Sequence, residues 1–200
     1  MSNSEQTSAG PLQRLRGEHV YLRPAERDDI ECFVRWFADA DVARHLSGQA
    51  PFSKAMEERW FEKMIEEQGK KSWHFVICLL GDDRPIGTIG FHHVNQEDGH
   101  AAFGISIGEK AEWSKGYGTD AVRALCDFGF GQLRLERIEL DVYEPNKRAQ
   151  RSYEKAGFVR EGVLRHAHFS DGEFKDVVRM ALLREEWAAQ PRRKSWDDGA

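Results

Sequence analysis

The 200-residue sequence has few cysteines, few prolines and no long apolar run. Its three cysteines are odd in number and lack the spacing of a metal site, so neither a disulfide framework nor a zinc module is predicted. Reduced thiols are typical of a cytoplasmic protein, which is the location we expect. No segment approaches the roughly 18 apolar residues of a membrane span, and residues 1–10 lack the apolar centre of a secretory signal. We therefore expect no membrane partner and no metal.

The charge balance also excludes a class of partner. The formal net charge is −5, and the chain has no strongly basic segment of the kind that binds nucleic acid. A hydrophobic fraction of 40% and a charged fraction of 32% are typical of a globular chain. The periodic part of the sequence predicts one domain over residues 15–187, with flexible tails at 1–14 and 188–200.

The order of the predicted elements indicates a mixed α+β fold. Helices are expected at 28–37, 53–68, 119–133 and 146–155, and strands at 19–23, 73–80, 86–94, 101–107, 137–143, 158–169 and 174–183. The three strands between 73 and 107 are separated by short turns, which predicts an antiparallel meander. A strand, a helix and a strand then follow one another from 101 to 143, as in a crossover connection.

A glycine-bearing segment at 113–121, with the sequence WSKGYGTDA, is expected to open the helix that follows it. Backbone N–H groups at a helix start lack internal partners, and glycines such as Gly116 and Gly118 let an anion approach them. A dinucleotide fingerprint is one alternative, since an acidic residue follows about 20 positions later. That alternative fits poorly, because the segment follows a meander instead of opening a series of parallel units. An ordinary surface turn is the other alternative.

The segment 146–158, with the sequence NKRAQRSYEKAGF, is expected to form a capped helix that carries Tyr153 and ends at Gly157-Phe158. Together, the two segments resemble the GCN5-related N-acetyltransferase (GNAT) family. They are most similar to the branch with ribosomal-protein alanine acetyltransferases and spermidine acetyltransferases. The resemblance extends over 15–187. It implies a GNAT-like, mainly antiparallel mixed sheet with a parallel central pair, flanked by helices.

The resemblance also implies an activity, namely transfer of an acetyl group from acetyl-CoA, as co-substrate, to a primary amine of a protein N-terminus or a small molecule. It implies a cofactor site made of Ile105, Ser106, Ile107, Trp113, Ser114, Lys115, Gly116, Tyr117, Gly118, Thr119, Asn146, Ala149, Ser152 and Tyr153. Asn146 is equally expected as the N-cap of its helix. The oligomeric state stays open, with a homodimer among the alternatives.

Acetyl transfer needs a proton donor for the leaving sulfur, and we expect Tyr153 to be that acid. Its phenol is protonated at pH 7 and can donate. The alternative is a core tyrosine that packs its helix. Cys126 lies among apolar residues of the helix at 119–133 and is expected to be a buried thiol, not a nucleophile.

The base is harder to assign, because many members of this branch carry Glu where this sequence has Ala102. His92 and His93, expected on opposite faces at the end of one strand, are candidates for that role. Glu139 and Asp141, which alternate onto one face of a later strand, are further candidates.

The acceptor amine follows from weaker signals. The acidic pairs Glu57-Glu58 and Glu66-Glu67 have the spacing of a solvated helix face, so they do not indicate a polyamine site. A protein N-terminus or another amine of low pKa needs less help from a base, and we favour it. A polyamine acetyltransferase and a catalytically weak CoA-binding module remain the alternatives; the second is kept open by Ala102.

Overall fold

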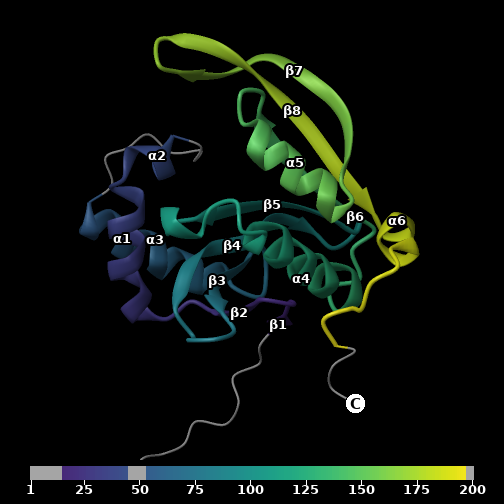
Figure 1. The fold of residues 1–200 in the computed structure, drawn as a ribbon, viewed down its shortest axis with the longest axis horizontal. Helices are drawn as coiled ribbons and strands as arrows, with labels where there is room; N and C mark the ends of the chain where they lie inside the picture. The colour runs from purple at the N-terminus through teal and green to yellow at the C-terminus, as the bar shows by residue number, and fades with distance from the viewer. Residues whose placement is uncertain (1–14, 45–52, 197–200) are drawn as a thin grey trace, which may run out of the picture.

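The computed structural model describes residues 15–44 and 53–196, which form one sheet with helices on both faces (Figure 1). The sheet order is β1-β2-β3-β4-β5-β6-β8-β7. The strands are β1 Leu15–Arg16, β2 Val20–Pro24, β3 Trp73–Leu79, β4 Pro85–Asn95, β5 His100–Ile107, β6 Arg137–Tyr143, β7 Val159–Ser170 and β8 Glu173–Leu183. Neighbours are antiparallel except β5 and β6, which are parallel. The predicted mixed sheet with a parallel central pair is confirmed.

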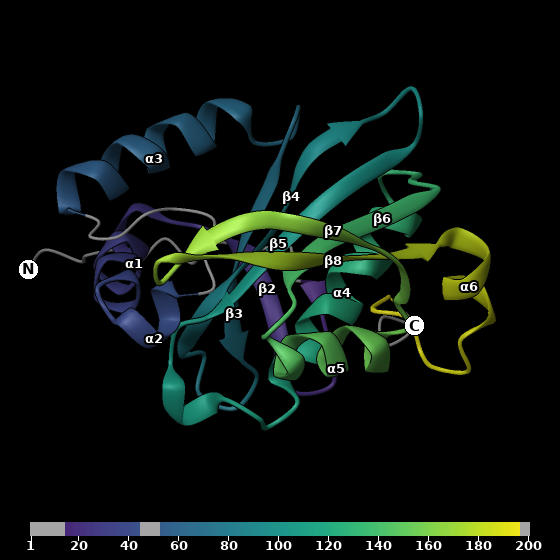
Figure 2. The same cartoon turned by 90° about the horizontal axis from the view of Figure 1, so that it is seen from above.

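Helices cover the two faces of the sheet unequally. They are α1 Ile30–Phe37, α2 Ala40–Ala43, α3 Lys54–Glu67, α4 Tyr117–Gly131, α5 Lys147–Ala156 and α6 Arg184–Ala189, with short 3-10 turns at Arg27–Asp29 and Lys110–Glu112. Figure 2 shows α3 on one side of the sheet, and α4 and α5 on the other. Two expected caps are present: the Ser53 hydroxyl accepts from the Met56 N–H at 3.3 Å, and the Asn146 side chain accepts from the Ala149 N–H at 3.1 Å.

Strand alternation builds a core on each face of the sheet. On β3, Phe75 and Ile77 pack with α4, whereas Val76 and Cys78 pack with α1 and α3. Cys126 lies in the α4 core at 1% exposure, and burial raises the pKa of its thiol far above the usual range. The thiol is therefore protonated and buried, as the sequence predicts.

The parallel pair opens along its length. β5 and β6 pair at His100 with Arg137, at Ala101 with Ile138 and at Ala102 with Glu139, and their described residues pair no further. Residues 103–107 and 140–143 therefore diverge, and β5 has backbone N–H and C=O groups that β6 does not use. We call this gap the β5–β6 opening.

The long β7–β8 hairpin rises from the edge of the sheet (Figure 1). β7 is the last strand, and its outer edge is unpaired among the described residues. Several large apolar side chains are exposed on the hairpin, namely Val159, Val163, Leu164, Phe169 and Phe174. A long edge strand with apolar side chains is a surface prone to pair with another chain.

The packed region extends beyond the boundary at 187 that the sequence predicts. The Arg192 guanidinium binds the Asp127 carboxylate of α4 through two hydrogen bonds of 2.5 and 3.0 Å. The Ser195 N–H donates to the same carboxylate at 2.7 Å. Asp127 is 1% exposed, and a buried carboxylate requires such partners. No helix of the described ranges is both long and apolar enough to span a membrane.

Candidate active site

One large cleft, of about 1190 Å³, opens along β4, β5 and β6. Its walls come from α1 and α3 on one side and from the start of α4 and from α5 on the other, and the β7–β8 hairpin closes part of it. The expected cofactor residues that line it are Ile105, Ser106, Ile107, Trp113, Ser114, Gly116, Tyr117, Gly118, Thr119, Asn146, Ala149, Ser152 and Tyr153. His92, His93, Glu139 and Asp141 line it too. The structure therefore brings nearly all the predicted site residues together.

The glycine loop has the geometry of an anion site. Gly116 is the N-cap of α4 and has a φ of +92°, a left-handed conformation that favours glycine. No side chain caps this helix, so the N–H groups of its first turn stay available to a ligand. The absence of a Cβ matters for backbone conformation here and not for space, because a Cβ on Gly116 would meet nothing within 4 Å. A phosphate fits this helix start.

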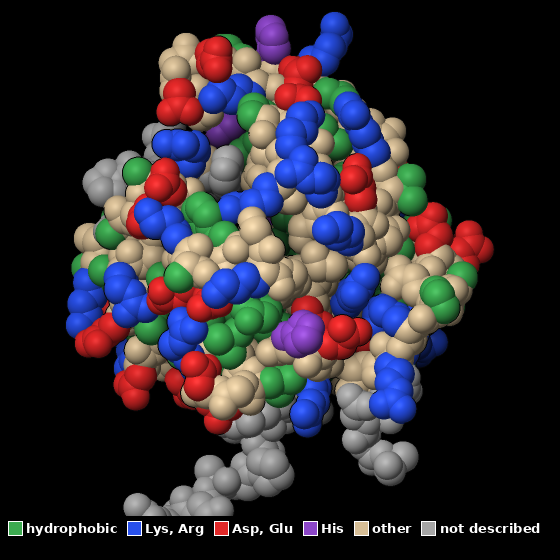
Figure 3. Space-filling view, viewed as in Figure 1, with side chains coloured by type: hydrophobic (Ala, Val, Ile, Leu, Met, Phe, Trp, Pro, Cys, Tyr) green, Lys and Arg blue, Asp and Glu red, His purple; other side chains and the backbone are tan. Residues whose placement is uncertain are grey.

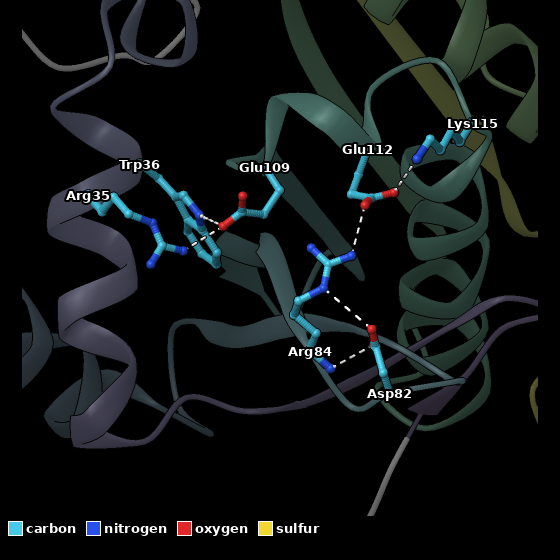
Figure 4. A network of polar contacts seen from close by, with 7 residues as sticks. All are labelled: Arg35, Trp36, Asp82, Arg84, Glu109, Glu112 and Lys115. Atoms are coloured by element: carbon cyan, nitrogen blue, oxygen red, sulfur yellow. Dashed lines mark hydrogen bonds and ion pairs between the residues drawn. The ribbon is translucent and has the colours of Figure 1, made fainter.

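The side chain of Lys115 is paired with Glu112 (Figure 4). The Glu112 carboxylate accepts from Lys115 Nζ at 2.9 Å and from Arg84 Nη2 at 2.8 Å. These hydrogen bonds, from Arg84 first, lower the pKa of Glu112. Lys115 thus contributes its backbone to the loop, and its charge is already paired.

A second carboxylate ties the end of β5 to α1 (Figure 4). Glu109 accepts from the Trp36 indole N–H at 2.8 Å and from Arg35 Nη2 at 2.5 Å, and both bonds lower its pKa, Trp36 foremost. The Trp36 ring packs closely on Gly108, where a Cβ would lie 2.1 Å from the indole. The segment between β5 and α4 is therefore fixed at both ends.

Trp113 and Arg148 join the loop to α5. The Trp113 indole N–H donates to the Ile107 carbonyl at 2.7 Å, and the Arg148 guanidinium lies 3.9 Å from the centre of the Trp113 ring. Figure 3 shows Lys and Arg side chains gathered over α5. Burial lowers the pKa of Arg148. Sequence reasoning missed Arg148, because the contact with Trp113 crosses 35 positions of the chain.

Tyr153 lies beside the β5–β6 opening. Its ring contacts Phe103 edge-to-face, with centroids 5.8 Å apart, and Phe158 at 6.3 Å. Gly157 ends α5 with a φ of +101°, which lets the chain turn and bring Phe158 beneath the tyrosine. Burial raises the pKa of Tyr153 to about 12, so the phenol is protonated at neutral pH. The hydroxyls of Thr119 and Ser152 lie 2.7 Å apart and connect α4 with α5.

The two adjacent histidines do not lie on opposite faces, and that expectation was wrong. His93 has a φ of +52° where the β4–β5 register shifts, between His92 and Asn95. This bulge breaks the strand alternation and brings the two imidazole rings to 5.3 Å between centroids. Both therefore line the cleft, His92 half-buried and His93 exposed. Burial and then the neighbouring His93 lower the pKa of His92.

A third histidine, His74 on β3, lines the same cleft and was missed. Its ring meets Trp60 edge-to-face at 5.4 Å. Burial, and then His92, lower the pKa of His74 to about 4, so it is uncharged at neutral pH. His74 is a single histidine in an otherwise apolar strand, and no sequence pattern marks such a residue as part of a site.

Glu139 and Asp141 lie on one face of β6, as the sequence predicts, but each is engaged by arginine. Asp141 accepts from Arg179 Nε at 2.9 Å and Nη2 at 2.8 Å. Glu139 accepts from Arg137 Nε at 3.0 Å and Nη2 at 2.9 Å. Such two-point pairs fix both partners.

A parallel pair that opens, a helix start suited to phosphate and a half-buried tyrosine beside the opening define an acyltransferase that uses a CoA thioester. The family model described as an acetyltransferase (GNAT) domain matches residues 19–159. An N-acetyltransferase of Bacillus licheniformis, p20, is 31% identical over 88% of this chain and 99% of its own. The spermidine N(1)-acetyltransferase of Escherichia coli K12 is 30% identical over 86% of this chain and 89% of its own.

A solved structure agrees with this assignment. The spermidine N-acetyltransferase of Vibrio cholerae, crystallised with CoA and spermine, superimposes with a TM-score of 0.79 at 26% identity, over 84% of this chain and 98% of that one. The chain belongs to the GNAT acetyltransferase family. It is an N-acetyltransferase with acetyl-CoA as co-substrate.

Proposed function

We propose that the acceptor of this GNAT enzyme has one primary amine of low pKa and no second ammonium group. The N-terminus of a peptide or protein is such an acceptor. The observation that carries the proposal is the pairing of the cleft carboxylates. Glu139 and Asp141, the acidic residues of β6 in the cleft, are both occupied by arginines. An acceptor with a second ammonium group would have to displace one of these arginines or bury a charge without a partner.

The reaction requires a neutral amine. An alkyl amine of pKa near 10 costs roughly 4 kcal/mol to deprotonate at pH 7, whereas an α-amine of pKa near 8 costs about 1.4 kcal/mol. A site with a weak base therefore acetylates an α-amine more readily than an alkyl amine. We propose His92 as that base, acting directly or through water, because its lowered pKa keeps it neutral. His93, whose ring contacts that of His92, assists His92 in this role from the solvent-exposed side.

We propose Tyr153 as the acid that donates its phenolic proton to the departing sulfur. Its position beside the β5–β6 opening and its raised pKa support this role. The thioester supplies an activated acetyl group, and the residues of the cleft hold the amine in line with it.

For the co-substrate, we propose that the backbone amides of 115–119 bind the pyrophosphate and that the edge of β5 at 105–107, which β6 leaves unpaired, pairs with the pantetheine. The left-handed Gly116 and the β5–β6 opening support these assignments. Asn146, Ala149 and Ser152 belong to the same proposed site, and the Asn146 side-chain oxygen also caps α5.

A polyamine acceptor is the second candidate, because two relatives reported above are spermidine acetyltransferases. Release of free CoA thiol, measured with an N-terminal peptide and with spermidine at matched concentrations, separates the two. Faster turnover of the peptide is expected; faster turnover of spermidine would contradict the proposal. Tight acetyl-CoA binding without thiol release from any amine would instead indicate a CoA-binding module.

We also propose that the enzyme is a cytoplasmic homodimer. Unpaired Cys32, Cys78 and Cys126 support a reducing compartment. The unpaired edge of β7, with its exposed Val163, supports a contact with a second copy. Light scattering should give twice the chain mass for the wild type and a smaller mass for Val163→Lys. A monomeric wild type would remove this part of the proposal.

A further inference from the structure

The cleft has an aromatic wall at its α1 and α3 end. Trp60 of α3 meets Phe33 edge-to-face at 6.0 Å and His74 at 5.4 Å, so two partners hold its ring. Phe37 of α1 lies against Phe33, with centroids 6.4 Å apart. Trp60, Phe37 and His74 all line the cleft, and Trp60 is 40% exposed. A fixed indole that faces a cleft offers apolar area to a ligand.

This end of the cleft offers little for a charged ligand group. His74 is neutral, since burial lowers its pKa to about 4. Asp41, the acidic residue that lines the cleft from α2, is paired with Lys110 at 3.1 Å. With Glu112, Glu139 and Asp141 also bound by basic side chains, each carboxylate described on the cleft wall has a cationic partner. An ammonium group would therefore lose its water without gaining a free carboxylate.

A floor of small residues connects the aromatic wall with the proposed base. His74, Gly90 and Gly104 lie side by side on β3, β4 and β5, in register. A Cβ on Gly104 would meet nothing nearer than His92 Cε1, at 3.7 Å, so space stands open above this strand. Neighbouring strands are about 4.8 Å apart, so the position of His74 is roughly 10 Å from β5.

We propose that the acceptor is a primary amine whose attached group is uncharged and carries an apolar side chain or ring that is seated against Trp60. This inference rests on the proposed function and specifies its substrate class. Two sources share the chemistry: a small arylalkylamine, and a peptide with an apolar residue next to its N-terminus. In either case the amine lies near His92, and the apolar group passes over Gly104 and along the His74 side chain, whose Nδ1 occupies the space above Gly90.

The test compares acceptors within two sets, one of alkyl amines and one of the low-pKa α-amines that the proposed function favours. The first set is 4-phenylbutylamine, butylamine and 1,4-diaminobutane. The second set is three tripeptide amides with Ala at both ends and Phe, Ala or Lys in the middle. In at least one set, kcat/KM should be at least about tenfold higher for the aromatic member than for the charged one, a typical discrimination for an apolar pocket. The set that shows this preference identifies the source.

Variants assign the effect to the wall. Trp60→Ala should lower kcat/KM for the aromatic acceptor by roughly 10-fold to 100-fold and leave that for butylamine or the all-Ala peptide within about threefold. Trp196→Ala is the matched control, because Trp196 is 46% exposed and does not line the cleft. It should change neither value. Unchanged acetyl-CoA affinity, measured by calorimetry, confirms that Trp60→Ala is folded.

The outcomes separate this inference from the proposed function. The inference is overturned if the charged members of both sets, or spermidine, are the better acceptors. It is also overturned if Trp60→Ala has no selective effect. Either result leaves the acetyltransferase activity in place. If the enzyme binds acetyl-CoA but acetylates none of these amines, both the proposed function and the inference are overturned.

Discussion

His92 and Ala102 lie directly opposite each other on β4 and β5. Directly opposed residues of antiparallel strands have Cβ atoms about 5 Å apart, so a histidine at 92 reaches the space above position 102. The methyl group of Ala102 leaves that space open, at the last residue before β5 and β6 diverge. The imidazole is thus positioned where the sequence lacks the carboxylate expected for its family.

His92→Gln should lower turnover by roughly 10²-fold, most strongly at pH 6–7, because the amine is protonated there and depends most on a base; burial lowers the pKa of His92, which favours its neutral form. The wild-type rate should rise with pH to at least about 8 as the α-amine loses its proton. Steady-state kinetics over pH 6–9 measure both effects. The exposed His93→Gln is the comparison and should have the smaller effect. Superimposable profiles for all three proteins would eliminate His92 as the base.

Tyr153→Phe should lower turnover by roughly 10²-fold and leave acetyl-CoA affinity nearly intact, because the ring contacts with Phe103 and Phe158 remain and only the donor is lost. Pre-steady-state thiol release isolates the chemical step from product release. The wild-type rate should show no loss of the acid below about pH 10, since burial raises the pKa of Tyr153 to about 12. An unchanged chemical step in the variant would assign Tyr153 to packing alone.

Gly116→Val should weaken acetyl-CoA binding, because valine disfavours the φ of +92° that begins α4 and adds bulk beside its N–H groups. Gly69→Val is a matched control: Gly69 has a φ of +79°, equally open surroundings and no place in the cleft wall. Both should lose roughly 1–2 kcal/mol of stability. Calorimetry should find weaker binding only in Gly116→Val; equal affinities in the two variants would refute the loop assignment.

His74→Gln should change how stability depends on pH. The pKa of His74 is 6.5 in the unfolded chain and about 4 in the folded one, so below pH 6.5 the unfolded state binds the proton first and stability falls. Between pH 6.5 and 5 this amounts to roughly 2 kcal/mol, at 1.36 kcal/mol per unit. Urea unfolding at pH 7 and pH 5 should give a steeper loss for the wild type than for the variant. Parallel losses would mean that His74 titrates normally.

The elements with local signals were predictable from the sequence. The meander from β3 to β5 follows from alternating strands separated by turn residues, and α5 follows from its Asn146 cap and Gly157 stop. The glycine loop was predictable as a helix start for the same reason, since a glycine with positive φ at such a start leaves its mark in the sequence at Gly116.

What was missed depends on contacts between distant segments. The bulge at His93 breaks the alternation that assigned faces to the two histidines, and only the pairing with β5 reveals it. The ion pair between Arg192 and Asp127 spans 65 positions, so composition alone did not reveal that the segment after 187 is held to α4 at Arg192. The aromatic wall at Trp60 likewise requires α3 to be placed against β3, and its helical spacing on its own was equally typical of core.

The two ends of the cleft come from different halves of the chain. The glycine loop, α4 and α5 lie after residue 112, whereas the aromatic wall and His74 lie before residue 75; the strands β4 and β5 lie between them. If the proposed donor and acceptor sites hold, substitutions in the first half can therefore change which amine is accepted while the proposed donor site is inherited intact. A gene lineage with this layout can diversify its acceptors by drift or by exchange of its N-terminal half, without passing through forms that fail to bind the donor.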